Sequence, residues 1–146
     1  MHDAIVLGDM RAALFREVGT HAPPGEFAGF ESAAGASFGQ VLEREQCCAW
    51  LAEDEHELAI GCAALLIFPR IPTPSSLARV EGHLSSVYTV PAWRRRGVSS
   101  ALVAAAVAKA RELGMGRIRL HATAEGRPVY TAAGFRLRDD EMELKL

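Results

Sequence analysis

Residues 87–100 read Val-Tyr-Thr-Val-Pro-Ala-Trp-Arg-Arg-Arg-Gly-Val-Ser-Ser and join two regular elements through a tight basic link. The residues before Pro91 are typical of a strand, and the alanine-rich residues 99–112 are typical of a helix that ends at Leu113-Gly114. A helix beginning there leaves its first backbone N–H groups without partners. The helix dipole, the permissive Gly97 and three arginines favour a bound anion, so this stretch predicts a site for the pyrophosphate of a phosphorylated cofactor.

Two other phosphate-binding motifs do not fit the chain. The dinucleotide fingerprint places its glycines directly after a first strand, but the nearest glycine pair, Gly114 and Gly116, follows a helix. The mononucleotide loop requires Gly-x-x-x-x-Gly-Lys-Ser/Thr, which the sequence lacks. Neither a Rossmann site nor a P-loop is predicted.

Outward from this stretch, the sequence predicts an α/β fold with a mixed sheet. The order strand, helix, strand over residues 87–120 requires a parallel pair joined by a right-handed crossover. Apolar runs at 47–53 and 58–68 flank a polar turn and predict an antiparallel hairpin. Other expected elements are strands at 4–7, 80–90 and 117–122, a strand pair within 135–146, and helices at 10–18, with Asp9 as N-cap, and 127–132.

Two segments are predicted to be loops. Residues 20–39 are rich in Gly, Pro and Ala and favour a loop with one short helix. Residues 69–76 contain three prolines, which lack the N–H group that a sheet needs, so they connect strands rather than join the sheet.

The composition indicates an ordinary globular chain. Its 146 residues are 49% hydrophobic and 23% charged, which predicts one domain spanning 1–146. A net charge of -2 supplies no general attraction to nucleic acid. There is no apolar run of about 18 residues and no basic, apolar leader, so we expect a cytoplasmic protein without a membrane partner. Three cysteines and five scattered histidines lack metal-ligand spacing, so no metal site is expected.

The segment Arg94-Arg95-Arg96-Gly97-Val98-Ser99 resembles the [QR]-x-x-G-x-[GA] acetyl-CoA motif of the GNAT superfamily of N-acetyltransferases. In that family the motif follows a strand ending in a V-x-x-P-like phrase, here 87–91, and opens a long helix. A later Y-x-x-x-G-F phrase matches Tyr130-Thr131-Ala132-Ala133-Gly134-Phe135. One departure is Ser99, which stands where Gly or Ala is usual and adds a hydroxyl near the expected phosphates.

This resemblance implies a mixed, mostly antiparallel central sheet of six to seven strands flanked by about four helices. A splayed parallel strand pair in it would bind acetyl-CoA. The backbone of Val87, Tyr88 and Thr89 would pair with the pantetheine amides like an added strand. Thr123 stands where many relatives carry an asparagine that contacts the cofactor. The pyrophosphate would be held by the segment Arg94, Arg95, Arg96, Gly97, Val98, Ser99 and Ser100.

The resemblance also suggests which side chains move protons when an amine attacks the thioester directly. Tyr130 matches a tyrosine that many relatives keep near the CoA sulfur, and its phenol is protonated at neutral pH. Several relatives place a basic carboxylate on the strand before the motif, where this chain has Ser85 and Ser86. His83 and Glu81 share a strand face with Ser85, and His83 is the candidate base, with Glu81 as the alternative.

The acceptor is expected to be an amine bound by the loops at 20–39 and 69–79. Glu26 and Glu31 are candidate contacts for a cationic amine. Small metabolites, antibiotics, peptide N-termini and lysine side chains all fit, and a homodimer is compatible with the sequence.

Two rival functions come from other classes. Gly35-Ala36-Ser37-Phe38-Gly39 fits the G-x-S-x-G elbow of serine hydrolases, although no apolar strand precedes it. The absence of a carboxylate at Ser85 and Ser86 also leaves open an acetyl-CoA-binding module that has no catalytic activity.

Overall fold

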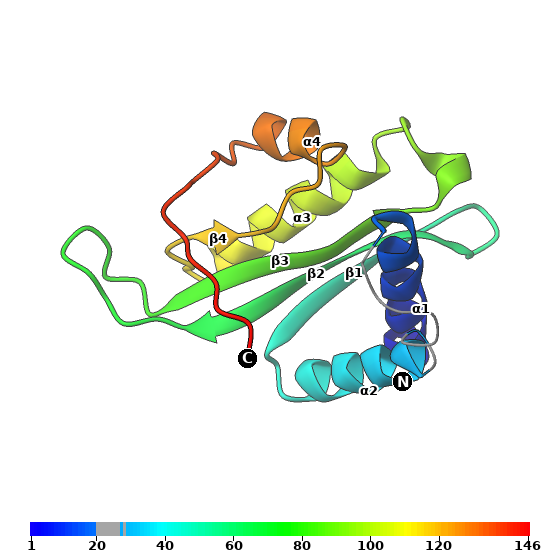
Figure 1. Cartoon of the computed structure of the whole chain (residues 1–146), viewed down its shortest axis with the longest axis horizontal. Helices are drawn as coiled ribbons and strands as arrows, with labels where there is room; N and C mark the ends of the chain where they lie inside the picture. Colours follow the sequence, from blue (N-terminus) through cyan, green and yellow to red (C-terminus); the bar gives the residue numbers. More distant parts are fainter. Residues whose placement is uncertain (20–26, 28) are drawn as a thin grey trace.

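The computed structural model describes residues 1–19, 27 and 29–146, and in this part of the chain a four-stranded sheet has the order β1-β2-β3-β4. β1 (Cys47–Glu53), β2 (Ala59–Pro69) and β3 (Val80–Thr89) pair antiparallel, and β3 pairs parallel with β4 (Ile118–Arg119). Two helices, α1 (His2–Glu17) and α2 (Phe30–Glu43), cover one face of this sheet (Figure 1). α3 (Val98–Glu112) and α4 (Arg127–Ala132) cover the other, and a 3-10 turn, η1 (Pro91–Trp93), precedes α3. The predicted mixed α/β class is confirmed.

Residues 4–7 are helical, so the first predicted strand is wrong. They lie in the first turns of α1, whose buried residues are Ala4, Leu7, Gly8, Met10 and Ala12. This spacing is that of a helix face. A run of four apolar residues shows no alternation and cannot distinguish the two structures. Asp9 therefore lies inside the helix rather than at its N-cap. Gly19 follows the end of the helix in the left-handed region, with φ of 63°.

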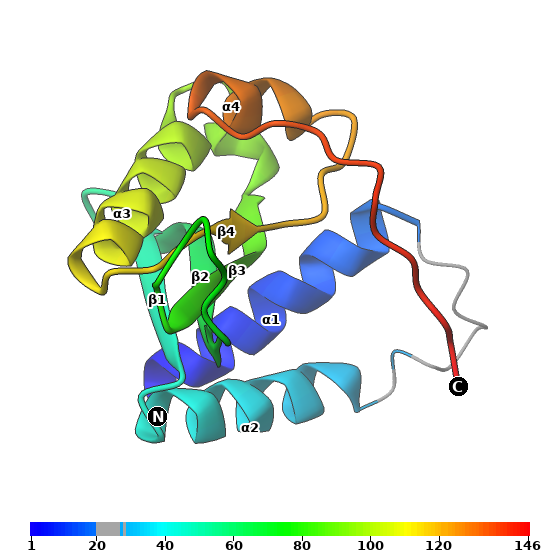
Figure 2. The same ribbon diagram turned by 90° about the vertical axis from the view of Figure 1, so that its left-hand side faces the viewer.

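α2 is longer than the short helix predicted within 20–39. Residues 20–26 and 28 of that stretch lie outside the described residues, but 30–43 form a continuous helix. Gly35 explains part of this wrong prediction, because this glycine lets two helices pack closely and does not form a turn. A Cβ on Gly8 of α1 would lie 2.7 Å from the Gly35 nitrogen, so the two helix backbones touch at a pair of glycines. Figure 2 shows α1 and α2 side by side beneath the sheet.

β3 contains a bulge, and after it the alternation of side chains between the two faces of the sheet is reversed. Cys62 pairs with Tyr88 while Ala64 pairs with Ser85, so two residues of β3 stand opposite one residue of β2. Ser86 takes the left-handed region there, with φ of 55°. Both serine side chains therefore lie on the α1 side of the sheet, and Tyr88 also faces α1.

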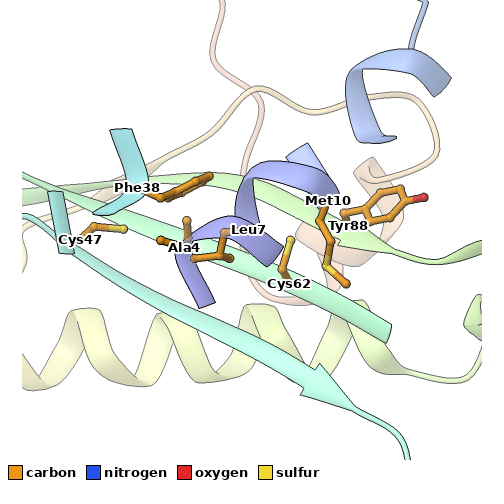
Figure 3. Packing of buried hydrophobic residues seen from close by; sticks show 8 residues of the cluster. Ala4, Leu7, Met10, Phe38, Cys47, Cys62 and Tyr88 are labelled. Carbon is orange, nitrogen blue, oxygen red and sulfur yellow. The ribbon is translucent and has the colours of Figure 1, made fainter. Parts of the chain in front are cut away.

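Two apolar cores lie on the two faces of the sheet. The core under α1 and α2 is shown in Figure 3 and consists of Ala4, Leu7, Met10, Phe38, Cys47, Cys62, Ala64 and Tyr88. The core under α3 consists of Ala63, Leu65, Leu84, Leu102, Val103, Ala106 and Ala110. The many alanines of α3 let this helix lie close to the strands. No helix within the described residues combines the length and the apolar character that crossing a bilayer requires.

The C-terminal residues form no strand pair, which corrects a second prediction. Met142, Leu144 and Leu146 alternate with charged residues as a strand would, yet all three are exposed. β4, at this edge, consists only of Ile118 and Arg119 and offers few backbone groups for pairing. The described sheet therefore has four strands rather than six to seven. The helices predicted at 99–112 and 127–132 are confirmed as α3 and α4.

Candidate functional site

The parallel pair β3/β4 opens after two residues and leaves a free strand edge. Pairing joins Gly82 to Ile118 and His83 to Arg119 and then stops, while β3 continues to Thr89. Gly82 donates its N–H to the Arg117 carbonyl at 2.9 Å, and at the other end of β3 Val90 donates to Ile60 of β2 at 2.9 Å. By alternation from Val90, the N–H groups of Val87 and Thr89 point to the open side. This edge can accept an extended chain of amides.

The turn into α3 presents six consecutive N–H groups. The first helical hydrogen bond runs from the Ala101 nitrogen to the Gly97 carbonyl at 3.0 Å, and residues 95–100 donate to no backbone acceptor in the described part of the chain. Arg95 and Gly97 both have left-handed backbone, with φ of 61° and 83°, which gathers neighbouring N–H groups into an anion-binding concavity. A Cβ on Gly97 would meet no protein atom within 4 Å, so the space beside it is open.

Arg94 has a different environment from the one that its place in the motif suggests. Its Nε donates to the Thr89 carbonyl at 3.0 Å, and its Nη2 donates to Glu17 Oε2 at 2.5 Å. Glu17 also accepts the Tyr88 hydroxyl at 3.0 Å. Arg94 therefore ties the end of α1 to the loop before α3 and already occupies the Thr89 carbonyl. Its contact with phosphate stays a prediction, and so do those of the neighbouring residues.

The remaining motif residues divide into anchored and free groups. Ser99 Oγ lies 2.9 Å from Thr89 Oγ1, so the unusual hydroxyl is satisfied within the protein. Val98 packs against the core under α3. Arg96 lies over the Trp93 ring, with the guanidinium carbon 4.9 Å from the ring centroid. Arg95, like Ser100, is exposed.

Tyr130 belongs to the apolar cluster under α3, which also contains Val87 and Val98. Its ring meets Phe135 edge-on with centroids 5.9 Å apart, and burial raises the pKa of the phenol above its usual value. The phenol therefore stays protonated at neutral pH. The Thr123 hydroxyl accepts the Gly126 N–H at 3.1 Å and so helps to begin α4; its cofactor contact remains a prediction.

His83 and Glu81 lie on the α1 side of β3 but in different surroundings. Glu81 is buried and binds Arg117 Nε at 2.6 Å and Arg119 Nη2 at 2.7 Å. The Arg117 hydrogen bond holds the pKa of this carboxyl below its usual range, which disfavours it as a base. His83 is half-buried, and burial lowers the pKa of its imidazole, with a further contribution from His121, whose ring centroid lies 5.6 Å away.

An open depression of about 480 Å³ lies beside these groups. It is lined by Phe68, Pro69, Glu81, His83 and Arg119. Phe68 and Pro69 come from the end of β2, at the start of the loop that the sequence associates with the acceptor. In residues 1–19, 27 and 29–146, no group of three His, Cys, Asp or Glu side chains could hold a metal ion.

Sequence reasoning missed Arg11, which approaches the bulge of β3 from α1. Its Nη1 donates to Ser85 Oγ at 3.0 Å and to Ser86 Oγ at 2.7 Å. The Cys62 thiol, whose pKa burial raises to about 12, donates to the Ser86 carbonyl at 3.1 Å. The only signal in the sequence was an isolated charge in an apolar part of the helix predicted at 10–18, and its meaning depended on the distant serines of β3.

Ser37 does not form a nucleophile elbow. It lies in the middle of α2, exposed, with helix on both sides, whereas the elbow requires a sharp turn between a strand and a helix. The serine hydrolase alternative is therefore wrong. Glu31, a candidate acceptor contact, forms an ion pair with Arg16, and Glu26 lies outside the described residues.

Comparison with solved structures finds the same fold over nearly the whole chain. A predicted acetyltransferase with acetyl-CoA from Clostridium acetobutylicum is 25% identical, with a TM-score of 0.87 over 99% of this chain and 90% of that chain. A GCN5-related N-acetyltransferase from Ralstonia eutropha is 27% identical, with a TM-score of 0.86 over 99% of this chain and 93% of that chain. Glucosamine-6-phosphate N-acetyltransferase from Arabidopsis thaliana, at 12% identity and a TM-score of 0.69 over 97% of this chain and 92% of that chain, shares the fold.

Sequence comparison identifies the family directly. No curated protein matches the sequence, but residues 10–135 match the family model of the acetyltransferase (GNAT) family. This range includes the turn into α3, the open edge of β3 and Tyr130. The chain therefore belongs to the GNAT family of acetyltransferases, which use acetyl-CoA as co-substrate.

Proposed function

We propose that this chain transfers the acetyl group of acetyl-CoA to a primary amine of a small molecule or peptide by direct attack within a ternary complex. The observation that best supports this proposal is the row of six free backbone N–H groups at residues 95–100. This row begins six residues after Thr89, where β3 and its unpaired edge end. A diphosphate and an amide-bearing arm are the two parts of CoA that such a row and such an edge can hold.

Each group in the site has a proposed task in binding the co-substrate. The amides of 95–100 hold the pyrophosphate, and Arg95 and Arg96 add positive charge. The N–H groups of Val87 and Thr89 pair with the pantetheine amides. Arg94 contributes indirectly, because its hydrogen bonds to Glu17 and to the Thr89 carbonyl hold the loop before α3 in place. Thr123 orients the start of α4 and thereby Tyr130, four residues after Gly126.

The chemistry requires a proton donor for the leaving thiolate and an acceptor for the proton of the attacking amine. Tyr130 is the donor, since its phenol has no hydrogen-bond partner within the described residues and its raised pKa keeps it protonated. His83 is the acceptor, since its lowered pKa keeps it neutral at pH 7. It lies four residues before Val87, about 13 Å along the strand, so the proton passes through water.

A panel of amines tests this function by release of free CoA thiol from acetyl-CoA, together with calorimetric binding of acetyl-CoA. Thiol release with at least one amine, reduced at least tenfold in Tyr130→Phe, supports acetyl transfer. Binding of acetyl-CoA without thiol release from any amine would instead favour the non-catalytic binding module. Failure to bind acetyl-CoA would overturn both.

A further inference from the structure

Arg11 differs from the other arginines near β3 because its partners are neutral. Its Nη1 contacts the hydroxyls of Ser85 and Ser86, and its guanidinium carbon lies 4.9 Å from the centre of the Phe15 ring. Within the described residues, no carboxylate comes within ion-pair distance of it. By contrast, Arg94 is paired with Glu17, and Arg119 with Glu81 and Glu141.

A half-buried cation without an opposite charge is costly. It loses part of its hydration and receives only dipoles in return. Burial accordingly lowers the pKa of Arg11 below its usual value, opposed by a smaller contribution from the Cys62 thiol and by none from a carboxylate. An anionic ligand at this place would offset that cost.

The donors that Arg11 has left are those that recognise an anion. Nη1 makes both serine contacts, while Nε and Nη2 donate to no acceptor in the part of the chain that the structure describes. The planar guanidinium binds carboxylates and phosphates through two parallel N–H···O bonds. Arg11 therefore retains a pair of donors with the right shape.

The position of Arg11 relates it to the proposed reaction. Ser85 is the last paired residue before the bulge and Ser86 the first residue in it, directly before Val87, where the free edge of β3 receives the pantetheine arm in the proposed function. Arg11 approaches this bulge from α1, on the face opposite α3 and Tyr130. An anion bound there lies on the acceptor side, close to the reacting end of the co-substrate.

The surrounding charges favour an anion as well. His83 lies on the same face. Burial lowers the pKa of its imidazole, and so do the charges of His121, Arg119 and Arg11, which together outweigh the smaller opposite contribution of Glu141. The carboxylate of Glu81 does not neutralise this face, because three arginines share it: Arg70, Arg117 and Arg119.

Resting on the proposed acetyl transfer, we infer that the acceptor is an amine that also carries a carboxylate or phosphate group, and that Arg11 binds this group beside the bulge of β3. Amino acids and phosphate esters of amino alcohols have this chemistry, and polyamines and neutral amines do not. Of the two glutamates considered for a cationic acceptor, Glu31 is paired with Arg16, and Glu26 lies outside the described residues.

A turnover experiment measures the preference directly. β-Alanine is compared with its amide, and O-phosphoethanolamine with ethanolamine, using kcat/KM for thiol release corrected to the neutral fraction of each amine. We expect the wild-type protein to prefer the anionic member of a pair by about 10- to 100-fold, and Arg11→Gln to reduce that ratio to about one. The matched control is Arg16→Gln, also on α1 but paired with Glu31, which keeps the wild-type ratio.

A binding experiment gives a readout that does not depend on turnover. Protein saturated with CoA, so that its pyrophosphate site is filled, is titrated calorimetrically with propionate for the carboxylate and with methyl phosphate for the phosphate. We expect one of them to bind wild type and Arg16→Gln, and to bind Arg11→Gln at least tenfold more weakly. Circular dichroism and the Tm identify a variant that fails to fold, in which case Arg11→Lys, which keeps the charge but loses the planar fork, replaces it.

The outcomes separate the two proposals. Anion binding that depends on Arg11, without thiol release from any amine, contradicts acetyl transfer but supports the anion site. Thiol release with equal kcat/KM for both members of each pair, or with an unchanged ratio in Arg11→Gln, overturns the anion site and leaves acetyl transfer intact.

Discussion

The hydroxyl oxygens of Thr89 and Ser99 lie 2.9 Å apart and join the last residue of β3 to the first turn of α3. Ser99 stands at the [GA] position of the acetyl-CoA motif that residues 94–99 resemble, and this contact directs its hydroxyl to the strand. The strand that offers the free edge and the helix that offers the free amides are thus joined directly.

Ser99→Ala should lower the free energy of unfolding by about 1 kcal/mol, because it removes one half-buried hydrogen bond. Thr89→Val should cost about the same, and the double variant should cost clearly less than the sum of the two. Chemical denaturation of the four proteins measures this coupling. Strictly additive effects would show that the two hydroxyls do not interact in solution.

Gly97→Asp should weaken acetyl-CoA binding at least tenfold, because it places a negative charge in the open space where the phosphates are proposed to lie. The matched control is Gly114→Asp at the other end of α3, where the backbone is also left-handed, with φ of 67°, and a Cβ also meets no atom within 4 Å. Calorimetric titration with acetyl-CoA compares the two variants. Equal affinities would refute the placement of the pyrophosphate.

Tyr130→Phe should lower kcat about 100-fold while KM for acetyl-CoA changes little, because the substitution removes a proton donor but keeps the ring. The contact with Phe135 is retained, so the Tm should be unchanged. Steady-state kinetics and a thermal melt are the measurements. A fall in Tm with unchanged kcat would instead indicate that Tyr130 is only a packing residue.

The pH dependence of kcat/KM should show a loss of activity on the acid side that comes from His83. Burial, His121, Arg119 and Arg11 all lower the pKa of this imidazole from its ordinary value of 6.5. The neutral, active form therefore dominates at pH 7, and the inactive cation accumulates only as the pH falls below 6.5.

His83→Gln tests this assignment with the same acceptor, so that the titration of the amine itself is common to both profiles. The variant should be slower near pH 7 and should lose the acid limb that is specific to the wild-type protein. Profiles of identical shape would exclude His83 as the base.

Glu81→Gln should destabilise the protein at pH 7 by about 3 kcal/mol, since it leaves three arginines without their shared buried carboxylate. Hydrogen bonding from Arg117 lowers the folded-state pKa of Glu81 below 4.5. Its contribution is therefore complete above pH 4.5 and is lost as the pH falls through the folded-state pKa.

Denaturation at several pH values measures the difference, with Glu141→Gln as control. Glu141 binds Arg119 at the surface, so its loss should cost less than about 1 kcal/mol. A Glu81→Gln variant that matches wild type at pH 7 would mean that the carboxylate contributes no net stability.

The second half of the chain was predictable because its signals are local. Val98–Glu112 and Arg127–Ala132 end at glycines with left-handed backbone, Gly114 and Gly134, and such endings can be read from the sequence. The free N–H groups at the start of α3 could also be predicted, because charge, a glycine and a helix start coincide within a few residues. Their contact with phosphate stays a prediction.

The parts that the sequence did not predict depend on contacts between distant residues. Residues 4–7 become helix because α1 packs on α2 at Gly8 and Gly35. Residues 136–146 follow a strand pattern toward the C-terminus but remain exposed beside the short β4. The role of Arg11 could not be predicted because its partners, Ser85 and Ser86, lie 74 and 75 residues away along the chain. No local sequence pattern indicates a contact between residues so far apart.

The extra residue at the bulge of β3 determines which face of the sheet each later side chain of this strand lies on. Without it, strict alternation would turn the Tyr88 ring toward α3 and separate its hydroxyl from Glu17. Glu17 would then hold Arg94 alone, and the serine hydroxyls could not both reach Arg11. The number of residues between His83 and Thr89 is therefore more tightly constrained than their identities, and a deletion there would disturb both the proposed co-substrate loop and the proposed acceptor face.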